Sequence, residues 1–486
     1  MARKKVSRVV AQSRGASGRK KPCDLLIHNA YLITLDPKRR VFSPGAVAVT
    51  GTRITAVGSE REIMAKYESS RLFDAHGATV HPGFIDPHVH IVHGTCRGVF
   101  GNTLAGAKGK ASFADWKADV TGEDEFDATA LAGIEMLRRG FTTFLEPGTA
   151  FETDAVAKGA ETIGVRALLA GCYLWDQIDN MKHLGGLDGQ SLYRRAPPKL
   201  ERCLDQLGAE LHRNKDPDAL VRGFVCIYGL GTASDELQKA AKSIAARNKV
   251  SFQQHECYVP AAKEADRANL RGKSRLVHLG EIGVLDENAA LVHMYALDDD
   301  DVAVVRETGA SIIWCPLAYL KLAIAYQVDC VIPRLSQEGV NVAIATDGAM
   351  DCAIGDGGPA GYFVSSTLHQ PLTPEAIIEM QTIAAAKAMR MESMIGSLET
   401  GKRADIVIRA ASAAETFPAV NPIHQLALTS REGSVDTVII NGEVVFRGGR
   451  STRVDEEAVV AAAKSSVERR MKRLGLKPST AWSITR

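Results

Sequence analysis

The sequence lacks the features that define several large classes of protein. No apolar run approaches the roughly 18 residues that a membrane-spanning helix needs. The net charge of +2 gives no electrostatic reason to expect a nucleic-acid or membrane partner. Nine cysteines are scattered without a CxxC pair, which disfavours a disulfide framework and a zinc ribbon. We therefore expect a protein of a reducing compartment, the cytoplasm.

The N-terminal stretch lacks acidic residues. MARKKVSRVVAQSRGASGRKK contains eight lysines and arginines and has no apolar core of the kind found in a secretory signal. We interpret residues 1–22 as a disordered basic tail. An organelle transit peptide is a minor alternative, and a nucleic-acid-binding arm is a weaker one because nothing downstream supports it.

The two ends of the remaining chain share a strand-like character. Residues 23–80 contain short alternating apolar runs bounded by Gly, Pro and Asp, and residues 396–450 look the same. Asn441 followed by glycine is a strong two-residue hairpin signal. We predict one small β-sandwich domain built from both chain ends. Residues 451–486 are expected to form a C-terminal helical extension that packs on the outside or at a subunit contact.

The middle of the chain, residues 81–395, alternates strand-like and helix-like segments. Helical patterns such as 235–248 and 300–309 lie between short apolar runs, and the run ending in HPGFIDPHVH brings the number of expected strands to eight. This order is typical of a (β/α)8 TIM-like barrel, an α/β fold whose active-site residues lie at the carboxyl ends of the strands.

Polar residues follow several of these apolar runs. His88 and His90 end the first run, and a strand points side chains at i and i+2 to the same face. His255, His293 and Asp347 end later runs. Each has an ordinary explanation alone, because His293 could be a core histidine and Asp347 part of a plain turn. Together they form an imidazole and carboxylate set that suits Zn²⁺ or another first-row divalent ion.

These motifs resemble the metal-dependent amidohydrolase superfamily. The resemblance rests on PGFIDPHVH, the later strand-end histidines, ATDG at 345–348 and GSLETGKRADIVI at 396–408, and it covers roughly residues 24–450. Within the superfamily the chain is similar to the chlorohydrolase and aminohydrolase group that acts on triazines and related heterocycles. The phenylurea and thiocarbamate hydrolases of the superfamily are a second neighbourhood. Family habit also implies a homodimer or larger homo-oligomer.

The resemblance implies a metal centre. One divalent ion, with Zn²⁺ favoured over Fe²⁺, Co²⁺ or Mn²⁺, would be bound by His88, His90, His255 and Asp347. His293 would hydrogen-bond the metal-bound water, and Asp347 is placed to take its proton and pass it to the leaving group. Relatives with two metals bridge them with a carboxylated lysine on the fourth strand. Here that strand reads GFVCIYGLG and contains no lysine, so one metal is expected.

Several positions depart from the pattern of the heterocycle-acting group. That group usually has a glutamate three residues after the fifth-strand histidine, where this chain has Tyr258, and Glu256 would face away on a strand. Tyr228 replaces a usual histidine after the fourth strand. Trp314 and Tyr319 replace the histidine and asparagine of a His-Cys-Pro-x-Ser-Asn run. These four aromatic residues are expected either to line the substrate pocket or to pack in the core, and His93 could also face the pocket.

The missing glutamate shapes the expected reaction. A heterocyclic carbon that carries an amino group is a poor electrophile unless its ring nitrogen is protonated, whereas a metal can polarise a carbonyl directly. We predict hydrolysis of an amide, urea, carbamate or thiocarbamate bond in a small aromatic or N-alkyl substrate. The alternatives are deamination or dechlorination of an N-heterocycle such as a triazine, purine or pyrimidine, and an inactive relative that keeps only the barrel.

Overall fold

The computed structural model describes residues 19–100, 110–183, 189–348, 350–477, 479 and 482. Most of the predicted basic tail, residues 1–18, lies outside the described residues. Its last two residues form strand β1 (Lys21–Pro22), which pairs in parallel with β5 (Tyr67–Glu68). The tail therefore ends at a paired strand. In the described part of the chain, no helix is both long and apolar enough to cross a membrane.

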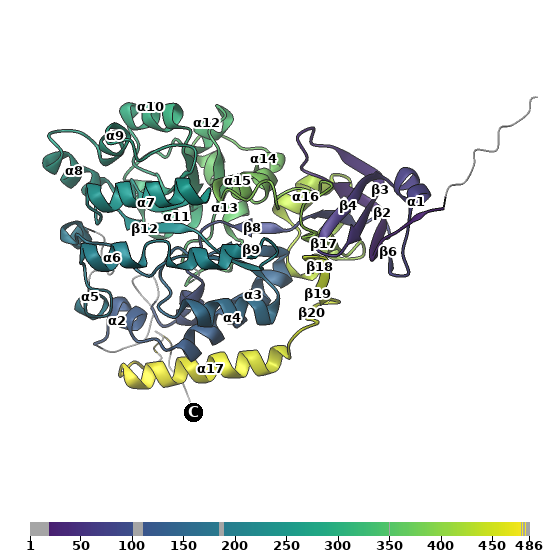
Figure 1. Cartoon of the computed structure of the whole chain (residues 1–486), viewed down its shortest axis with the longest axis horizontal. Coiled ribbons are helices and arrows are strands. Elements are labelled where there is room, and N and C mark those ends of the chain that lie inside the picture. Colours follow the sequence, from purple (N-terminus) through teal and green to yellow (C-terminus); the bar gives the residue numbers. More distant parts are fainter. Residues whose placement is uncertain are drawn as a thin grey trace, which may run out of the picture.

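One mixed sheet takes strands from both ends of the chain (Figure 1). Its order is β20-β19-β18-β17-β7-β2-β3-β4, with β6 paired to β2. β7 and β17 join the two halves because Pro82 lies opposite Ile406 in an antiparallel pair. The strands are β2 (Leu25–Ile33), β3 (Val41–Thr50), β4 (Arg53–Ser59), β6 (Leu72–Asp74), β7 (Thr79–Pro82), β17 (Ile406–Arg409), β18 (Val435–Ile440), β19 (Glu443–Arg447) and β20 (Arg450–Ser451).

The hairpin between β18 and β19 forms where the sequence predicted it. Asn441 has a φ of 50° and Gly442 a φ of 76°. A two-residue hairpin turn of this kind needs two positive φ angles, which the Asn-Gly pair tolerates better than other residues.

The middle of the chain forms two parallel sheets, which confirms the predicted α/β class. Their orders are β11-β10-β9-β8 and β12-β13-β14-β15-β16, and every pairing within them is parallel. Only Phe224 separates β11 from β12. The strands are β8 (Phe84–Asp86), β9 (Phe141–Leu145), β10 (Arg166–Leu169), β11 (Val221–Gly223), β12 (Val225–Gly229), β13 (Phe252–Glu256), β14 (Ala289–His293), β15 (Ser311–Trp314) and β16 (Val342–Ile344).

Alternation along the parallel strands creates two apolar layers. Ile313 and Ala343 belong to a cluster that also contains residues of α15, whereas their neighbours Ile312 and Val342 belong to the larger cluster that includes the surrounding helices. This is the two-faced burial expected of strands covered on both sides.

Helices with clear start and stop signals surround these strands (Figure 1). In α3, Thr121 and Asp124 form a capping box, and Gly140 ends the helix in the left-handed conformation. The helices are α1 (Glu60–Lys66), α2 (Phe113–Ala118), α3 (Gly122–Arg139), α4 (Thr153–Ile163), α5 (Gln190–Arg195), α6 (Leu200–Gln206), α7 (Asp235–Asn248), α8 (Pro260–Asn269), α9 (Arg275–Glu281), α10 (Asp299–Thr308), α11 (Pro316–Lys321), α12 (Ile332–Gln337), α13 (Gly357–Thr367), α14 (Pro374–Met380), α15 (Ile383–Ala388), α16 (Pro422–Leu428) and α17 (Glu456–Arg473).

The C-terminal extension packs on its own chain. Helix α17 runs beside α3 (Figure 1), and its Ser466 hydroxyl donates to Asp124 at 2.6 Å. The Arg470 guanidinium lies 3.8 Å from the centre of the Trp116 ring in α2. The last helix therefore supports α2 and the start of α3 from outside.

A buried ion pair joins the parallel strands to the mixed sheet. Arg166 in β10 donates from Nε and Nη2 to the two carboxylate oxygens of Asp405 at 3.0 and 3.1 Å, and the side chains are 0% and 4% exposed. Removing one partner of a buried ion pair leaves the other charge buried without a counter-ion and without water.

We predict that Asp405→Asn lowers the free energy of unfolding by about 3–5 kcal/mol, because Arg166 then keeps its charge without a counter-ion. Urea titration measures the change. As a control, Glu281→Gln breaks a Lys273 pair that is 48% exposed on both sides and should cost at most about 1 kcal/mol. Equal losses in the two variants would contradict this role for the buried pair.

Candidate metal centre and active site

Three predicted histidines form one compact group. His88 and His90 follow β8, and His255 lies in β13. One ring nitrogen from each lies within 4.8 Å of the others. The ring centroids of His88 and His255 are 4.8 Å apart and those of His88 and His90 are 5.0 Å apart. The sequence positions at strand ends therefore converge in space.

Asp347 joins the group through the backbone as well as through its side chain. Its amide donates to the His88 carbonyl at 2.9 Å, and its carbonyl accepts from the His90 amide at 3.1 Å. These bonds belong to a parallel bridge between Val89 and Asp347. The Asp347 Oδ1 atom lies 3.2 Å from His90 Nε2 and 3.9 Å from His88 Nε2. The carboxylate is thus fixed against the histidines.

His293 completes the predicted constellation. Its ring stacks on His255 with centroids 5.4 Å apart at 25°. Both His293 and Asp347 have positive φ angles, 77° and 63°. Holding a non-glycine residue in such a backbone conformation costs about 1–3 kcal/mol of free energy, and residues of this kind occur most often at functional sites. The surrounding strands therefore impose this geometry.

Each of the three clustered histidines is held through its Nδ1 atom. His88 Nδ1 bonds Gln253 Oε1 at 2.7 Å, and His255 Nδ1 bonds the Tyr228 carbonyl at 2.6 Å. His90 Nδ1 bonds the Thr149 hydroxyl at 3.0 Å. These bonds occupy the Nδ1 atoms and leave the Nε2 atoms as the candidate metal ligands.

The unused nitrogens fit a metal ion. His88 Nε2 is buried and has no hydrogen-bond partner among the described residues, although a buried polar atom without a partner is costly. Burial lowers the pKa of His88 and His90 to about 4 and that of His255 to about 3. The imidazoles are therefore neutral at neutral pH, which is the form that binds metals.

The carboxylate of Asp347 has the charge that such a site requires. Burial alone would raise its pKa, but the hydrogen bond between its carboxylate and His90 holds the pKa well below its usual value. A neutral imidazole set with one carboxylate suits a first-row divalent ion. The four residues thus have the chemistry of a divalent metal site.

Sequence reasoning missed the network behind His90. The Thr149 hydroxyl donates to Glu146 Oε1 at 2.5 Å while facing His90. Glu146 also accepts from the amides of Ile91 and Thr149. Its burial raises its pKa to about 7. Because Glu146 directly follows β9, its position at a strand end was a signal that could have found it.

The predicted pocket aromatics separate into two sets. Tyr228 lies 5.1 Å from His255 and Tyr258 lies 4.3 Å from His293, measured between ring centroids. His93 stacks on His90 at 5.1 Å. These three residues lie at the histidine cluster.

Trp314 and Tyr319 lie elsewhere. A Cβ atom placed on Gly361 of α13 would come within 3.1 Å of the Trp314 ring, so this tryptophan packs outward against a helix. The Tyr319 hydroxyl donates to the Val328 carbonyl at 2.7 Å, and Tyr295 lies between Tyr319 and His293. Neither ring contacts the histidines. The strand register explains this for Trp314, since Ile313 occupies the inner layer.

Glu256 faces away from the histidines, as the strand pattern predicts. It lines a small hollow with Asp266 and Arg275 on the outer side of β13. Burial raises its pKa to about 8. It therefore does not supply the carboxyl group that Tyr258 lacks.

Comparison with known proteins identifies the family. Residues 79–445 match the amidohydrolase family. The chain belongs to the amidohydrolase family. It is 30% identical over 450 residues to the 5-methylthioadenosine/S-adenosylhomocysteine deaminase of Syntrophobacter fumaroxidans, covering 89% of this chain and 95% of that protein. It is 26% identical over 466 residues to the 5'-deoxyadenosine deaminase of Methanosarcina mazei, covering 92% and 98%.

Solved structures of similar proteins agree with this assignment. An adenosine deaminase from Xanthomonas campestris with bound zinc superposes with a TM-score of 0.78 at 25% identity, covering 93% of this chain and all of that one. The atrazine chlorohydrolase of Arthrobacter aurescens TC1, complexed with zinc and atraton, has a TM-score of 0.76 at 20% identity, covering 91% and 100%. The second likeness shows the fold alone.

The predicted resemblance to the amidohydrolases is confirmed, and so is the predicted hydrolysis of a C–N bond. This amidohydrolase is a metal-dependent hydrolase of C–N bonds. The predicted substrate class has less support, because these two relatives are named as deaminases of adenine-containing compounds. They favour the alternative of heterocycle deamination over the amide, urea or carbamate hydrolysis expected from Tyr258.

We predict that Thr149→Val weakens metal binding about 10–100-fold, because the valine keeps the shape of the side chain and removes the hydroxyl that links His90 to Glu146. Competition of the protein with a chelating dye for Zn²⁺ measures the affinity. The matched control is Thr162→Val, whose hydroxyl bonds only the Lys158 carbonyl on an exposed face of α4. Wild-type affinity in Thr149→Val would show that this link does not tune the site.

Proposed function

We propose that the protein deaminates an amino-substituted aromatic N-heterocycle, replacing the exocyclic amino group with oxygen from water and releasing ammonia. The observation that carries the proposal is the convergence of His88, His90, His255 and Asp347 on one point. Deamination as the reaction is supported by relatives that are named as deaminases and match about nine-tenths of the chain. The proposed metal is one Zn²⁺ ion.

The residues divide the reaction between them. His88, His90, His255 and Asp347 would hold a Zn²⁺ ion, which would supply a nucleophile at neutral pH by lowering the pKa of water from about 15.7 towards about 7. Asp347 accepts the proton of the attacking water and delivers it to the departing amino group. His293, stacked on His255, hydrogen-bonds the attacking oxygen. His93, Tyr228 and Tyr258 form the aromatic wall around the substrate ring.

The proposed architecture places this chemistry in a single barrel. The two parallel sheets close into one (β/α)8 barrel, and the mixed sheet forms a small β-domain beside it. The bridge between Val89 and Asp347 supports closure because it links the chain just after β8 to the chain just after β16. With closure, all proposed ligands lie at one end of the barrel.

Hydrolysis of an amide, urea or carbamate is a second candidate, and a specific observation favours it. The ring of Tyr258 occupies the place beside His293 where a carboxyl group was expected. A carbonyl carbon needs no proton donor at a ring nitrogen, since a metal can polarise the carbonyl itself. An inactive barrel is disfavoured because His88, His90, His255 and Asp347 lie together.

A substrate panel separates these candidates. The zinc-loaded protein is incubated with adenine nucleosides and aminotriazines, with ammonia measured, and with anilides and phenylureas, with aniline measured. We expect ammonia from the heterocycles and its loss after treatment with a chelator. Aniline release without ammonia would favour the second candidate. No turnover of any substrate by the metal-loaded protein would support an inactive barrel.

We predict that Asp347→Asn lowers kcat by about 10²–10⁴-fold, because the amide can neither take nor return the proton. Steady-state assays on the best substrate of the panel measure this. Asp351→Asn is the matched control, since Asp351 lies exposed four residues further along the same loop. Full turnover by Asp347→Asn would refute the proton-transfer role.

A further inference from the structure

Lys117 is a buried cation close to the candidate site. Lys117 lies near the end of the short helix α2 and is 5% exposed. It forms no hydrogen bond or ion pair with another described residue. Burying an ammonium group without a counter-ion is costly. A position that served packing alone would be filled better by methionine or leucine.

Two aromatic rings hold Lys117 towards the histidines. Its Nζ atom lies 5.2 Å from the ring centres of both Phe113 and Tyr173. Phe113 contacts His93 at 5.5 Å between centroids, and His93 stacks on His90. On the other side, Tyr173 lies 6.1 Å from Tyr228, which packs on His255. The rings beside the ammonium therefore contact the rings that lie at the histidine cluster.

The charge of Lys117 reaches the catalytic groups. Burial lowers the pKa of Lys117 to about 8, while the charges of Asp347 and Glu146 act in the opposite direction. The ammonium is therefore within electrostatic range of Asp347.

We propose that Lys117 is the substrate-contacting donor that protonates the ring nitrogen next to the attacked carbon. This inference rests on the proposed deamination. It resolves the difficulty at Tyr258, because the chain has no carboxyl group beside His293 and yet a heterocyclic carbon needs protonation of the adjacent nitrogen to accept a nucleophile. An ammonium held in an apolar, aromatic wall is a suitable donor.

The proton balance closes without another reactant. Water gives one proton to Asp347, and its oxygen bonds to the ring carbon. The electron pair of the C=N bond moves to the ring nitrogen, which takes a proton from Lys117. The C–N bond then breaks, its pair leaves with the amino group, and Asp347 protonates that group to give ammonia. The remaining hydroxyl proton is lost as the carbonyl forms and replaces, through solvent, the one that Lys117 gave.

We predict that Lys117→Met lowers kcat for the heterocycle at least 100-fold, while the metal content stays unchanged and the thermal midpoint does not fall, because methionine fills a similar volume without the donor or the buried charge. Lys117→Arg should not recover kcat, because a guanidinium keeps its proton and cannot transfer it to the ring nitrogen. Lys158→Met is the control, because Lys158 is exposed on α4. Wild-type kcat in Lys117→Met would overturn the proposal.

A binding experiment tests the same contact without turnover. The protein is first stripped of metal with a chelator so that adenine is not turned over, and it is then titrated with adenine and with 1-deazaadenine, in which CH replaces the ring nitrogen next to the amino-bearing carbon. The wild type should bind adenine about 10-fold more tightly, and Lys117→Met should bind the two equally. Equal binding by the wild type, a preference that Lys117→Met retains, or no binding of either compound overturns the proposal.

The two experiments separate this inference from the proposed function. A Lys117-dependent preference for adenine together with no ammonia release from any heterocycle would contradict deamination and leave the contact intact. Ammonia release that Lys117→Met does not slow would contradict the contact and leave deamination intact.

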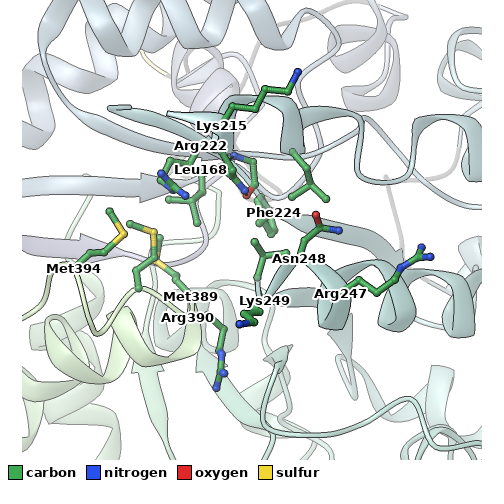
Figure 2. Close-up of a pocket in the computed structure, with 15 residues that line it drawn as sticks. Leu168, Lys215, Arg222, Phe224, Arg247, Asn248, Lys249, Met389, Arg390 and Met394 are labelled. Atoms are coloured by element: carbon green, nitrogen blue, oxygen red, sulfur yellow. Dashed lines mark hydrogen bonds between the residues drawn. The ribbon is translucent and has the colours of Figure 1, made fainter. Parts of the chain in front are cut away.

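A separate pocket is lined by residues from several parts of the chain (Figure 2). It has a volume of about 460 Å³ and includes Val250, just before β13, whereas His255 lies towards the other end of that strand. The lining includes the apolar residues Phe224 and Met389. It also includes the cationic residues Lys215, Arg222, Arg247, Lys249 and Arg390 and no aspartate or glutamate.

The cations of this pocket are not neutralised by the protein. None of the five forms an ion pair with a carboxylate among the described residues, although most arginines on other surfaces of the chain do. Arg222 donates only to the backbone carbonyls of Asp216 and Pro217. Unpaired cations around a hollow create a positive potential that attracts anions.

The geometry points to a binding site for a phosphorylated small molecule, with its phosphates at the cations and an apolar part over Phe224 and Met389. We predict that isothermal titration detects ATP or inorganic pyrophosphate binding to the wild type and that the double variant Arg222→Gln/Lys249→Gln binds at least 10-fold more weakly. The control Lys239→Gln/Lys464→Gln removes two exposed lysines elsewhere.

The two probes distinguish which part of the ligand is recognised. Tighter binding of ATP than of pyrophosphate supports the apolar contact, and equal binding restricts recognition to the phosphates. Absence of binding by both probes at millimolar concentration, or equal loss in the control variant, overturns the proposal. The thermal midpoint of each variant verifies that the fold is intact.

Discussion

The backbone bridge between Val89 and Asp347 is the contact on which the site depends. It joins the segment after the first parallel strand to the segment after the last one, through bonds of Asp347 with the backbones of His88 and His90. Residues from distant parts of the sequence thereby meet with fixed geometry. The same bridge holds Asp347 at a positive φ that it would not adopt freely.

Burial and hydrogen bonding then determine what the meeting point can do. The strands remove the histidines from water and keep their imidazoles neutral. Gln253, Thr149 and the Tyr228 carbonyl occupy the Nδ1 atoms, so that only the Nε2 atoms remain to bind a metal. Orientation of metal-binding histidines by such partners is general. The site is thus preorganised by residues that are not themselves ligands.

The sequence can group the proposed ligands because the fold repeats. Each of them lies at or just after the carboxyl end of a parallel strand, and these ends meet, so position along the chain is enough to group His88, His255 and Asp347. Side-chain direction is harder to predict. Trp314 lies one residue from the inward-facing Ile313 and packs outward, and only the register of β15 reveals that.

The contacts that loops and short helices make with the strand-end residues could not be predicted from the sequence. Lys117 comes from a short helix outside the strand pattern, and its place beside the histidines depends on how α2 packs under α17. Thr149 reaches His90 from a loop after β9. Such residues carry no periodic signal, because loops and short helices are positioned by the packing of the whole fold.

The central claim is that four residues of one chain bind one divalent metal ion. Elemental analysis of the purified protein, compared with a His255→Ala variant prepared in parallel, tests it most directly. The account predicts one metal ion per chain in the wild type and less than a tenth of that in the variant. Two ions per chain, or equal metal content in the two proteins, would contradict it.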